Sequence, residues 1–240
     1  MDPTIYLLGQ LIIVFLTFGL ISTFIYGLRH AMGLLRVRAE GRRRLVFFVV
    51  AGLGLWLTIL AVLAWAGFFR NFAARPPRLL LVVIPPLLAI LVLLFSRKVR
   101  LLLLAIPPGW LLYAQSFRIL MELFLWLGYR GDYVPVLMTF EGLNYDIVVG
   151  LTAPMAGLVF FGRNRYHRLQ AVLWNVFGVA LLLNIIAVSL MCLPEESPLH
   201  VFDVQPANRF VADFPFIWIP GFIVPSTLLL HLFSLKQLMM

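Results

Sequence analysis

Long apolar runs alternate with short polar connectors along the whole chain. Several runs reach about 18 residues or more, the length that a helix needs to cross a hydrocarbon core of about 30 Å. The pattern predicts an all-α fold: a polytopic helical membrane bundle that forms a single domain over residues 1–240. We expect seven spans, at Ile5–Leu28, Leu45–Phe69, Leu79–Ser96, Leu101–Gly128, Leu143–Phe161, Leu169–Leu193 and Ile217–Leu235.

The basic residues predict the orientation of these spans. Cytoplasmic loops of membrane proteins carry an excess of lysine and arginine. If the first connector, residues 29–44, lies inside, thirteen basic residues are inside and five are outside. We therefore expect the N-terminus outside and the C-terminus inside. The exception is the segment Arg70–Arg78, which places three arginines on the expected outer side.

Acidic residues gather on the expected outer side, where two long connectors, residues 129–142 and 194–216, also lie. Acids contribute little to membrane topology, so the insertion rule does not account for this distribution. Both connectors mix aromatic, aliphatic and charged residues, which is not typical of disordered linkers. We expect them to fold back over the helix ends as a cap, and we expect polar function on that face.

Composition and charge support the membrane interpretation and exclude one class of partner. The chain is 62% hydrophobic and 12% charged, whereas soluble domains average about 25% charged residues. The net charge of +9 is of the kind found in nucleic-acid-binding proteins. Its arginines, however, fall in short connectors between apolar runs, where topology places them. We therefore expect membrane lipid, and no nucleic acid, as a partner.

One apolar run carries charged residues. In YAQSFRILMELFLW, Gln115, Arg118 and Glu122 fall within about 60° of one another on one helix face. An isolated charge at the bilayer centre costs about 2.5–3.5 kcal/mol on insertion scales. Other helices should therefore enclose this face. Arg118 and Glu122 are four residues apart, so their side chains can pair directly, and we place Arg118 in the outer half of its span.

The next run begins with FEGLNYDIVVGLTAP, which holds three more polar side chains. One outer loop joins it to the preceding run, so the two helices should be neighbours. We expect one outward-facing ligand pocket, lined by Gln115, Arg118, Glu122, Glu141, Asn144 and Asp146. Three alternatives stay open: a structural Arg118–Glu122 pair, a lipid phosphate held by Arg118, and a helix-capping role for Asn144.

Known catalytic and cofactor motifs are absent from the sequence. It contains no H-E-x-x-H zinc motif and no glycine-rich phosphate loop, and we expect no metal and no cofactor. Ser197, His200 and Asp203 are three residues apart in one connector, a spacing that rarely forms a hydrolase triad. His231 is interpreted as a helix-end histidine and Asn175 as a structural residue of its span. The catalytic residues, if there are any, stay unknown.

Two stretches carry a resemblance to known proteins. MTFEGLNYDIVVGLTAP (residues 138–154) and QPANRFVADFPFIWIPGFIVP (residues 205–225) are similar to an uncharacterised family of bacterial polytopic inner-membrane proteins. The resemblance covers roughly the last four spans. It implies a multi-pass protein of the bacterial inner membrane, and it implies no activity.

Three functions fit these observations. The first is binding, and possible transport, of a small polar or amphiphilic ligand in an outward-facing intramembrane pocket. The second is a membrane-embedded enzyme that acts on a lipid headgroup, with a carboxylate as acid or base. The third is a membrane scaffold or sensor without a ligand pocket. A cavity beside Arg118 would distinguish the first two from the third.

Overall fold

The computed structural model describes residues 1–162 and 166–240, and these residues form helices, turns and loops. Arg163 and Arg165, which were counted for the orientation, lie outside the described residues. The α-helices are α1 (Pro3–Leu34), α2 (Ala39–Trp65), α3 (Leu80–Phe95), α4 (Arg97–Ala105), α5 (Pro108–Tyr113), α6 (Arg118–Arg130), α7 (Ile147–Phe161), α8 (Arg168–Met191) and α9 (Val224–Leu238). Short 3₁₀ segments are η1 (Phe68–Arg70), η2 (Ala114–Phe117), η3 (Val136–Met138) and η4 (Phe210–Ala212), and η5 (Ile219–Ile223) is a π-helix.

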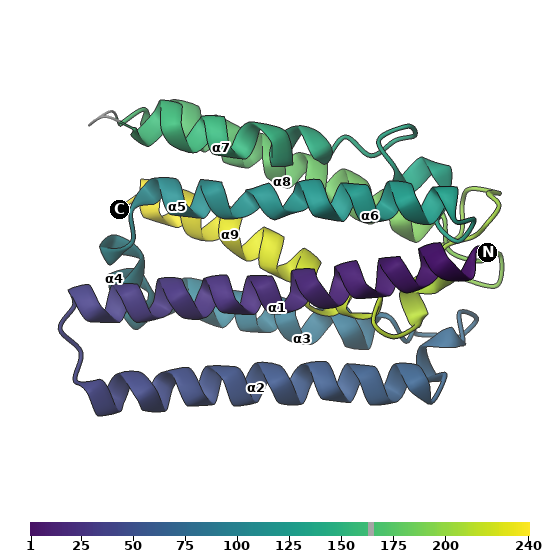
Figure 1. Cartoon of the computed structure of the whole chain (residues 1–240), viewed down its shortest axis with the longest axis horizontal. Coiled ribbons are helices and arrows are strands. Elements are labelled where there is room, and N and C mark those ends of the chain that lie inside the picture. The colour runs from purple at the N-terminus through teal and green to yellow at the C-terminus, as the bar shows by residue number, and fades with distance from the viewer. Residues whose placement is uncertain (163–165) are drawn as a thin grey trace.

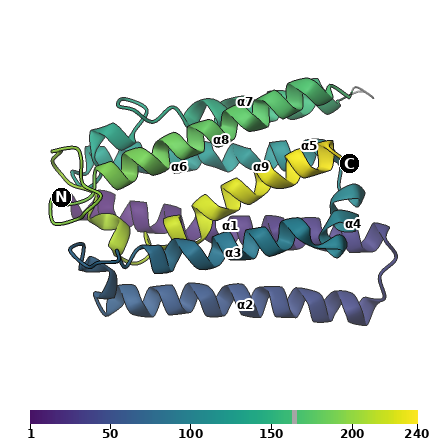
Figure 2. The ribbon, with the colours of Figure 1, turned by 180° about the vertical axis from the view of Figure 1, so that it is seen from behind.

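The long helices lie side by side and alternate in direction, so the chain passes repeatedly from one end of the bundle to the other (Figure 1). The two termini lie at opposite ends. The long connectors gather at the N-terminal end, whereas α4 lies near the C-terminus. Seen from behind, α9 crosses obliquely between α8 and α3 (Figure 2). The all-α class is therefore confirmed.

Five helical segments are long and apolar enough to cross a membrane. They are Pro3–Leu34, Ala39–Trp65, Pro108–Arg130, Arg168–Met191 and Ile219–Leu238, and α3 with α4 makes a sixth if the bent pair counts as one span. Helix α7 has 15 residues, about 22 Å at 1.5 Å per residue, and is shorter than a hydrocarbon core. The architecture is that of a multi-pass membrane protein. The count of seven spans and the orientation stay predictions.

The outward faces of the helices are apolar, whereas Arg118 and Glu122, the charged residues in the interior of the segment Pro108–Arg130, are buried. Phe15, Val92, Phe95 and Leu173 are each more than half exposed. Arg118, in contrast, is among the largest side chains that are fully buried in this structure. This arrangement suits lipid surroundings, because a charge that faces acyl chains costs several kcal/mol whereas an apolar side chain there does not.

Helix α3 ends where the chain meets Ser96, and α4 leaves at an angle of 77° to it. The Ser96 hydroxyl accepts a hydrogen bond from the backbone N–H of Val99, so it caps the new helix. The next span then begins at Pro108, where the missing proline N–H leaves no unsatisfied donor. The predicted span Leu101–Gly128 therefore divides into α4, which lies across the bundle end, and the helix from Pro108.

The segment before α9 is unwound into the π-helix η5, and prolines stand at positions 215, 220 and 225 of this part of the chain. Its Gly221 carbonyl accepts a hydrogen bond from the Trp56 indole at 2.9 Å, so a group loosened from the helical ladder finds a partner on α2. Single turns of π-helix occur frequently at functional sites. This one leads directly into α9, the helix at the centre of the bundle.

Candidate functional site

A cavity of about 220 Å³ lies among α3, α6, α8 and the η5–α9 segment. We call it the helix cavity. Its walls are mostly apolar, and they include Val83, Leu182 and Ile186. It reaches the connectors at the N-terminal end of the bundle through residues of the segments 69–80 and 197–211. Its charged lining residues, within the described part of the chain, are Arg78, Arg118, Glu122 and Asp146.

The central contact of this region is an ion pair between α6 and the start of α7. Arg118 Nε donates to Asp146 Oδ2 at 2.6 Å, and Arg118 Nη2 pairs with Asp146 Oδ1. Two parallel contacts of this kind fix the planes of the guanidinium and the carboxylate relative to each other. Both side chains are almost fully buried. The enclosure of Arg118 by other helices, which the sequence required, is therefore confirmed.

This pairing differs from the direct Arg118–Glu122 contact that their spacing allowed. Among the described residues, no ion pair within 4.0 Å involves Glu122. An i, i+4 spacing brings two side chains to one face of a helix, but neighbouring helices decide their final partners. Here α7 presents Asp146 on the other side of the guanidinium, and Asn144 holds Glu122.

Arg118 also begins a chain of hydrogen bonds that crosses to α9 and α8. Its Nη1 contacts His231 Nε2 at 2.9 Å, and His231 Nδ1 contacts Asn175 Oδ1 at 3.0 Å. Arginine nitrogens only donate, so Nε2 accepts and the ring proton is on Nδ1, where it is donated to Asn175. Asn175 Nδ2 in turn donates to Ser234 Oγ at 2.9 Å. The histidine is thus held as a neutral ring in one tautomer.

Glu122 has a different environment from Asp146. Both of its carboxylate oxygens lie 2.8 Å from the amide nitrogen of Asn144, which also donates to the Met138 carbonyl at 3.0 Å. The Asn144 oxygen accepts from the backbone N–H of Asp146 at 3.0 Å, and it thereby orders the turn that leads into α7. Glu122 is 1% exposed, and it borders the helix cavity.

The two remaining predicted residues lie apart from this centre. Gln115 is buried in η2, and its amide donates to the Thr227 carbonyl of α9 at 3.2 Å. Glu141 is exposed on the connector between α6 and α7, where it accepts from the Trp126 indole at 2.8 Å. The structure therefore brings Arg118, Glu122, Asn144 and Asp146 together, places Gln115 one turn away, and leaves Glu141 on the surface.

Local packing explains how α7 comes close enough to deliver Asp146. A Cβ built on Gly150 would lie 2.9 Å from the backbone nitrogen of Ile119, and one on Gly157 would lie 2.4 Å from the Tyr113 ring. Only glycine fits such close approaches. Asp146 stands one turn before Gly150, so the same close approach presses its carboxylate against Arg118. These two glycines therefore serve helix packing.

Arg118 lies near the middle of the helical segment Pro108–Arg130. The prediction of an outer-half position assumed that the span starts earlier, at Leu101. Because the chain bends at Ser96 and the span begins at Pro108, Arg118 is central within its helical segment. Its depth in the membrane stays a prediction. The 3₁₀ turn η2 immediately before Arg118 also interrupts the regular helix at this level, as is common at functional hinges.

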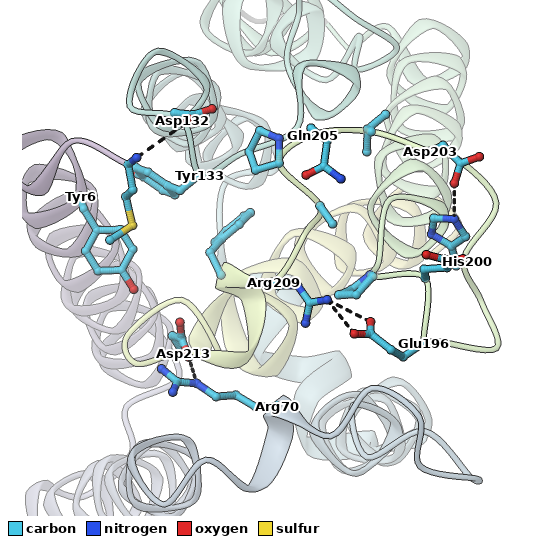
Figure 3. Close-up of a pocket in the computed structure, with 17 residues that line it drawn as sticks. Tyr6, Arg70, Asp132, Tyr133, Glu196, His200, Asp203, Gln205, Arg209 and Asp213 are labelled. Carbon is cyan, nitrogen blue, oxygen red and sulfur yellow. Dashed lines mark hydrogen bonds and ion pairs between the residues drawn. The ribbon is translucent and has the colours of Figure 1, made fainter.

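A second cavity, of about 560 Å³, opens at the N-terminal end of the bundle (Figure 3). We call it the end cavity. Its ion pairs include Arg70–Asp213 at 2.7 Å, Arg209–Glu196 at 2.8 Å and His200–Asp203 at 2.9 Å. Figure 3 shows these pairs around the rim, with Tyr6 and Tyr133 on the α1 side. Five of the acids that the sequence placed on one face of the protein line this cavity: Asp132, Glu195, Glu196, Asp203 and Asp213.

Contacts at the end cavity shift the pKa values of His200 and Glu196. His200 donates one ring N–H toward the Leu193 carbonyl at 2.6 Å and faces Asp203 with the other nitrogen, and these contacts raise its pKa. Arg209 donates to Glu196 and lowers the pKa of that carboxyl. Ser197 lies in the lining of the helix cavity instead, so the three residue types of a triad do not converge here.

Phe210 lines both cavities. It is 5% exposed, and its ring contacts those of Phe124, Tyr133 and Phe216. The connector that carries it, residues 193–211, contributes to the walls of both cavities. The two spaces therefore lie in sequence from the bundle end toward Glu122.

We call the cluster of Arg118, Glu122, Asn144 and Asp146 the polar centre. Sequence reasoning missed the part that α8 and α9 play in it. His231, Asn175 and Ser234 were treated as local residues of their spans, yet they continue the hydrogen-bond chain from Arg118. One signal was present: polar side chains within spans tend to face the bundle interior and one another. The sequence does not show which spans pack together, and so it could not pair residues 113 positions apart.

The described residues contain no group of three or more histidine, cysteine, aspartate or glutamate side chains that could hold a metal ion. The polar centre instead offers one carboxylate with spare acceptor capacity, one arginine–aspartate pair and a neutral histidine. This set can orient and neutralise a polar group that enters the helix cavity.

Comparison with protein families gives one result. A family model described as a domain of unknown function (DUF8737) matches residues 76–239. The chain matches no curated protein and no solved structure. The matched region runs from the segment before α3 to the last residues of the chain, and it contains the whole polar centre and most of the helix cavity. Because this match covers more than half of the sequence, the chain belongs to the DUF8737 family.

Proposed function

We propose that this protein binds an amphiphilic molecule in the helix cavity, with the polar end of the ligand at Glu122 and the Arg118–Asp146 pair. The supporting observation is that the cavity borders these buried charges while most of its wall is apolar. Ligand sites commonly combine an apolar lining with a few placed polar groups. In a scaffold without a ligand, the helix face of Gln115, Arg118 and Glu122 would be fully packed, with no cavity beside it.

The size and position of the cavity favour a membrane ligand over a large soluble one. Its volume of about 220 Å³ is below the range of about 300–1,000 Å³ for drug-sized ligands. A headgroup and the first part of a chain would fill it. The lining continues to Leu80, which is 41% exposed on α3, so the rest of an acyl chain has an apolar route along α3 and α8.

Each polar residue then has a role in the proposal. Glu122 receives the polar group of the ligand, and Asn144 holds the carboxylate in place. The Arg118–Asp146 pair supplies a fixed dipole beside it, and His231 keeps the guanidinium oriented. Gln115 ties η2 to α9 near the cavity wall. The outward-facing direction and the bacterial inner membrane remain parts of this proposal, because they follow from the arginine distribution and from the resemblance.

A membrane-embedded enzyme is the weaker candidate. General acid–base chemistry on a headgroup would use two carboxylates or a carboxylate and a free histidine. Asp146 already accepts two contacts from Arg118, and His231 uses both ring nitrogens in the hydrogen-bond chain. Glu122 alone is available as an acid or base. Binding, with or without transport, therefore explains more of the geometry.

A pair of substitutions on α8 tests the proposal. Ile186→Trp fills part of the helix cavity, whereas Leu183→Trp adds the same bulk to the lipid-facing side, where Leu183 is 56% exposed. Protein purified from membranes is analysed by mass spectrometry for retained small molecules and lipids. We expect a ligand that the wild type and Leu183→Trp retain and that Ile186→Trp loses by about tenfold.

Equal retention in all three proteins would contradict the proposal, and so would the absence of any specific retained molecule. A thermal unfolding curve of each variant serves as the control for folding. Transport is examined separately, because binding in the cavity is required for it but does not demonstrate it.

A further inference from the structure

The charged residues that line the helix cavity do not all form ion pairs. Arg118 and Asp146 neutralise each other, and His231 is held as a neutral ring. Glu122 is equally buried, yet no cation among the described residues lies within 4.0 Å of it. Removing an ionised carboxylate from water without a partner is costly. The structure therefore contains a buried acid whose counter-charge is not supplied by the described protein residues.

The hydrogen bonding of Glu122 is also incomplete. A carboxylate offers about four acceptor positions on its two oxygens. The donor facing it is Asn144 Nδ2, which lies at the same 2.8 Å from both oxygens. That nitrogen also donates to the Met138 carbonyl, so one amide hydrogen is left to be shared between the two carboxylate oxygens. The remaining acceptor positions are free for a group in the cavity.

We infer that the ligand of the helix cavity is an amphiphile with an ammonium group, which donates its N–H hydrogens to Glu122. This inference rests on the proposed function and specifies the class of ligand. An ammonium group carries three donors and one positive charge, so it satisfies the free acceptor positions and the missing counter-charge together. A carboxylate or phosphate at this position would meet a like charge and no free donor.

Arg78 extends the argument to the ligand's outer part. It is partly exposed in the segment before α3, where it donates to the Phe68 carbonyl at 2.8 Å and lies over the Phe68 ring. It is the other charged lining residue without an ion pair among the described residues. A zwitterionic lipid with an ammonium group and a phosphate would meet Glu122 and Arg78, respectively, whereas a simple alkylamine would use Glu122 alone.

The test uses the full chain in phosphatidylcholine nanodiscs and three probes of equal chain length: octylammonium, octanol and octanoate. Binding is measured as the ligand-induced rise of the unfolding temperature. We expect octylammonium to bind the wild type at least about tenfold more tightly than octanol, and octanoate to bind least. In Glu122→Gln we expect the preference for octylammonium over octanol to be lost.

Short-chain phosphatidylethanolamine and phosphatidylcholine form a second matched pair. Both are zwitterionic, but only the ethanolamine lipid has N–H donors. Preferential binding of the ethanolamine lipid identifies a membrane lipid as the source of the ammonium group. Binding of octylammonium without that lipid preference identifies a smaller amine.

The possible failures are distinguishable. If all three octyl probes bind equally and Ile186→Trp blocks them all, the cavity binds amphiphiles but the ammonium inference is wrong. If octanoate binds best, the inference is also wrong, and Arg118 rather than Glu122 selects the ligand. If Ile186→Trp changes the binding of no probe, the proposed function itself is contradicted. Comparison of the three probes on the wild type decides the charge preference even if Glu122→Gln fails to fold.

Discussion

The polar centre and the end cavity both contain arginine–carboxylate pairs, but these pairs differ in their surroundings. The Arg118 and Asp146 side chains are 1% and 7% exposed, whereas those of Arg209 and Glu196 are 58% and 53% exposed. Breaking a buried pair leaves a charge without solvent and typically costs about 3–5 kcal/mol. An exposed pair contributes about 0–1 kcal/mol. We therefore expect the Arg118–Asp146 pair to contribute much more to folding stability than the Arg209–Glu196 pair.

The largest effect is expected when the buried pair is broken. Asp146→Ala leaves the Arg118 guanidinium buried with His231 as its remaining side-chain partner, and we expect a loss of about 3–5 kcal/mol in unfolding free energy. The measurement is unfolding in detergent micelles. The matched control is Glu196→Ala, which breaks the exposed pair with Arg209 and should cost far less, because exposed pairs contribute little to stability. Equal losses in the two variants would show that burial does not separate the two regions.

A smaller loss is expected when the approach of α7 to α6 is blocked. The Cβ of Gly150→Ala would meet the backbone of Ile119 at 2.9 Å, and a side-chain rotation cannot relieve that contact. Overpacking of this kind costs about 1–3 kcal/mol. Gly52→Ala in α2 is the control, because nothing lies within 4 Å of its added Cβ, and it should be neutral or slightly stabilising. A neutral Gly150→Ala would refute the packing argument.

Removal of an exposed charge should have little effect. Arg209→Ala breaks its pair with Glu196 at the end cavity, and we expect a change of less than about 1 kcal/mol. Because solvent-exposed pairs are screened by salt, the difference from wild type should shrink further between low and high ionic strength. Unfolding temperatures measured at two salt concentrations test this. A large loss that is independent of salt would place Arg209 in the structural core of the connector.

The smallest expected effect is a pH dependence at His200. Its pKa is raised in the folded protein by the Leu193 carbonyl and Asp203. The contacts therefore stabilise the fold fully below the unfolded pKa of about 6.5, and this contribution is lost as the pH rises through the higher folded pKa. The direct measurement is a titration of the His200 ring by NMR. In His200→Gln the corresponding slope of unfolding temperature against pH should disappear.

Sequence patterns predicted the general architecture and the importance of one helix face. Runs of apolar residues located the long helices, and the cost of a charge in lipid required Arg118 to be enclosed. The same patterns ended one span at Ser96, but they could not predict that Arg97–Ala105 forms a separate helix and that the next span begins only at Pro108, because the apolar residues from Leu101 to Ile106 resemble the start of a span. They also could not predict that α7 is short, since Asn144 and Asp146 order a turn where the run suggested more helix.

The sequence predicted which residues meet at the candidate site better than it predicted the contacts between them. Arg118, Glu122, Asn144 and Asp146 meet, but the spacing of Arg118 and Glu122 suggested the wrong partner for each. Partners across helices depend on which helices pack together, and that information is not local. His231 shows this limit, because it lies 113 residues from Arg118 in the chain and yet contacts its guanidinium.

The position of Phe210 has a consequence for access. Since its ring borders both cavities, Phe210 lies between the end cavity and the helix cavity. Three neighbouring aromatic rings hold it in place, so turning it aside means losing those contacts together. We therefore expect a smaller residue at position 210 to widen the connection between the end cavity and the helix cavity.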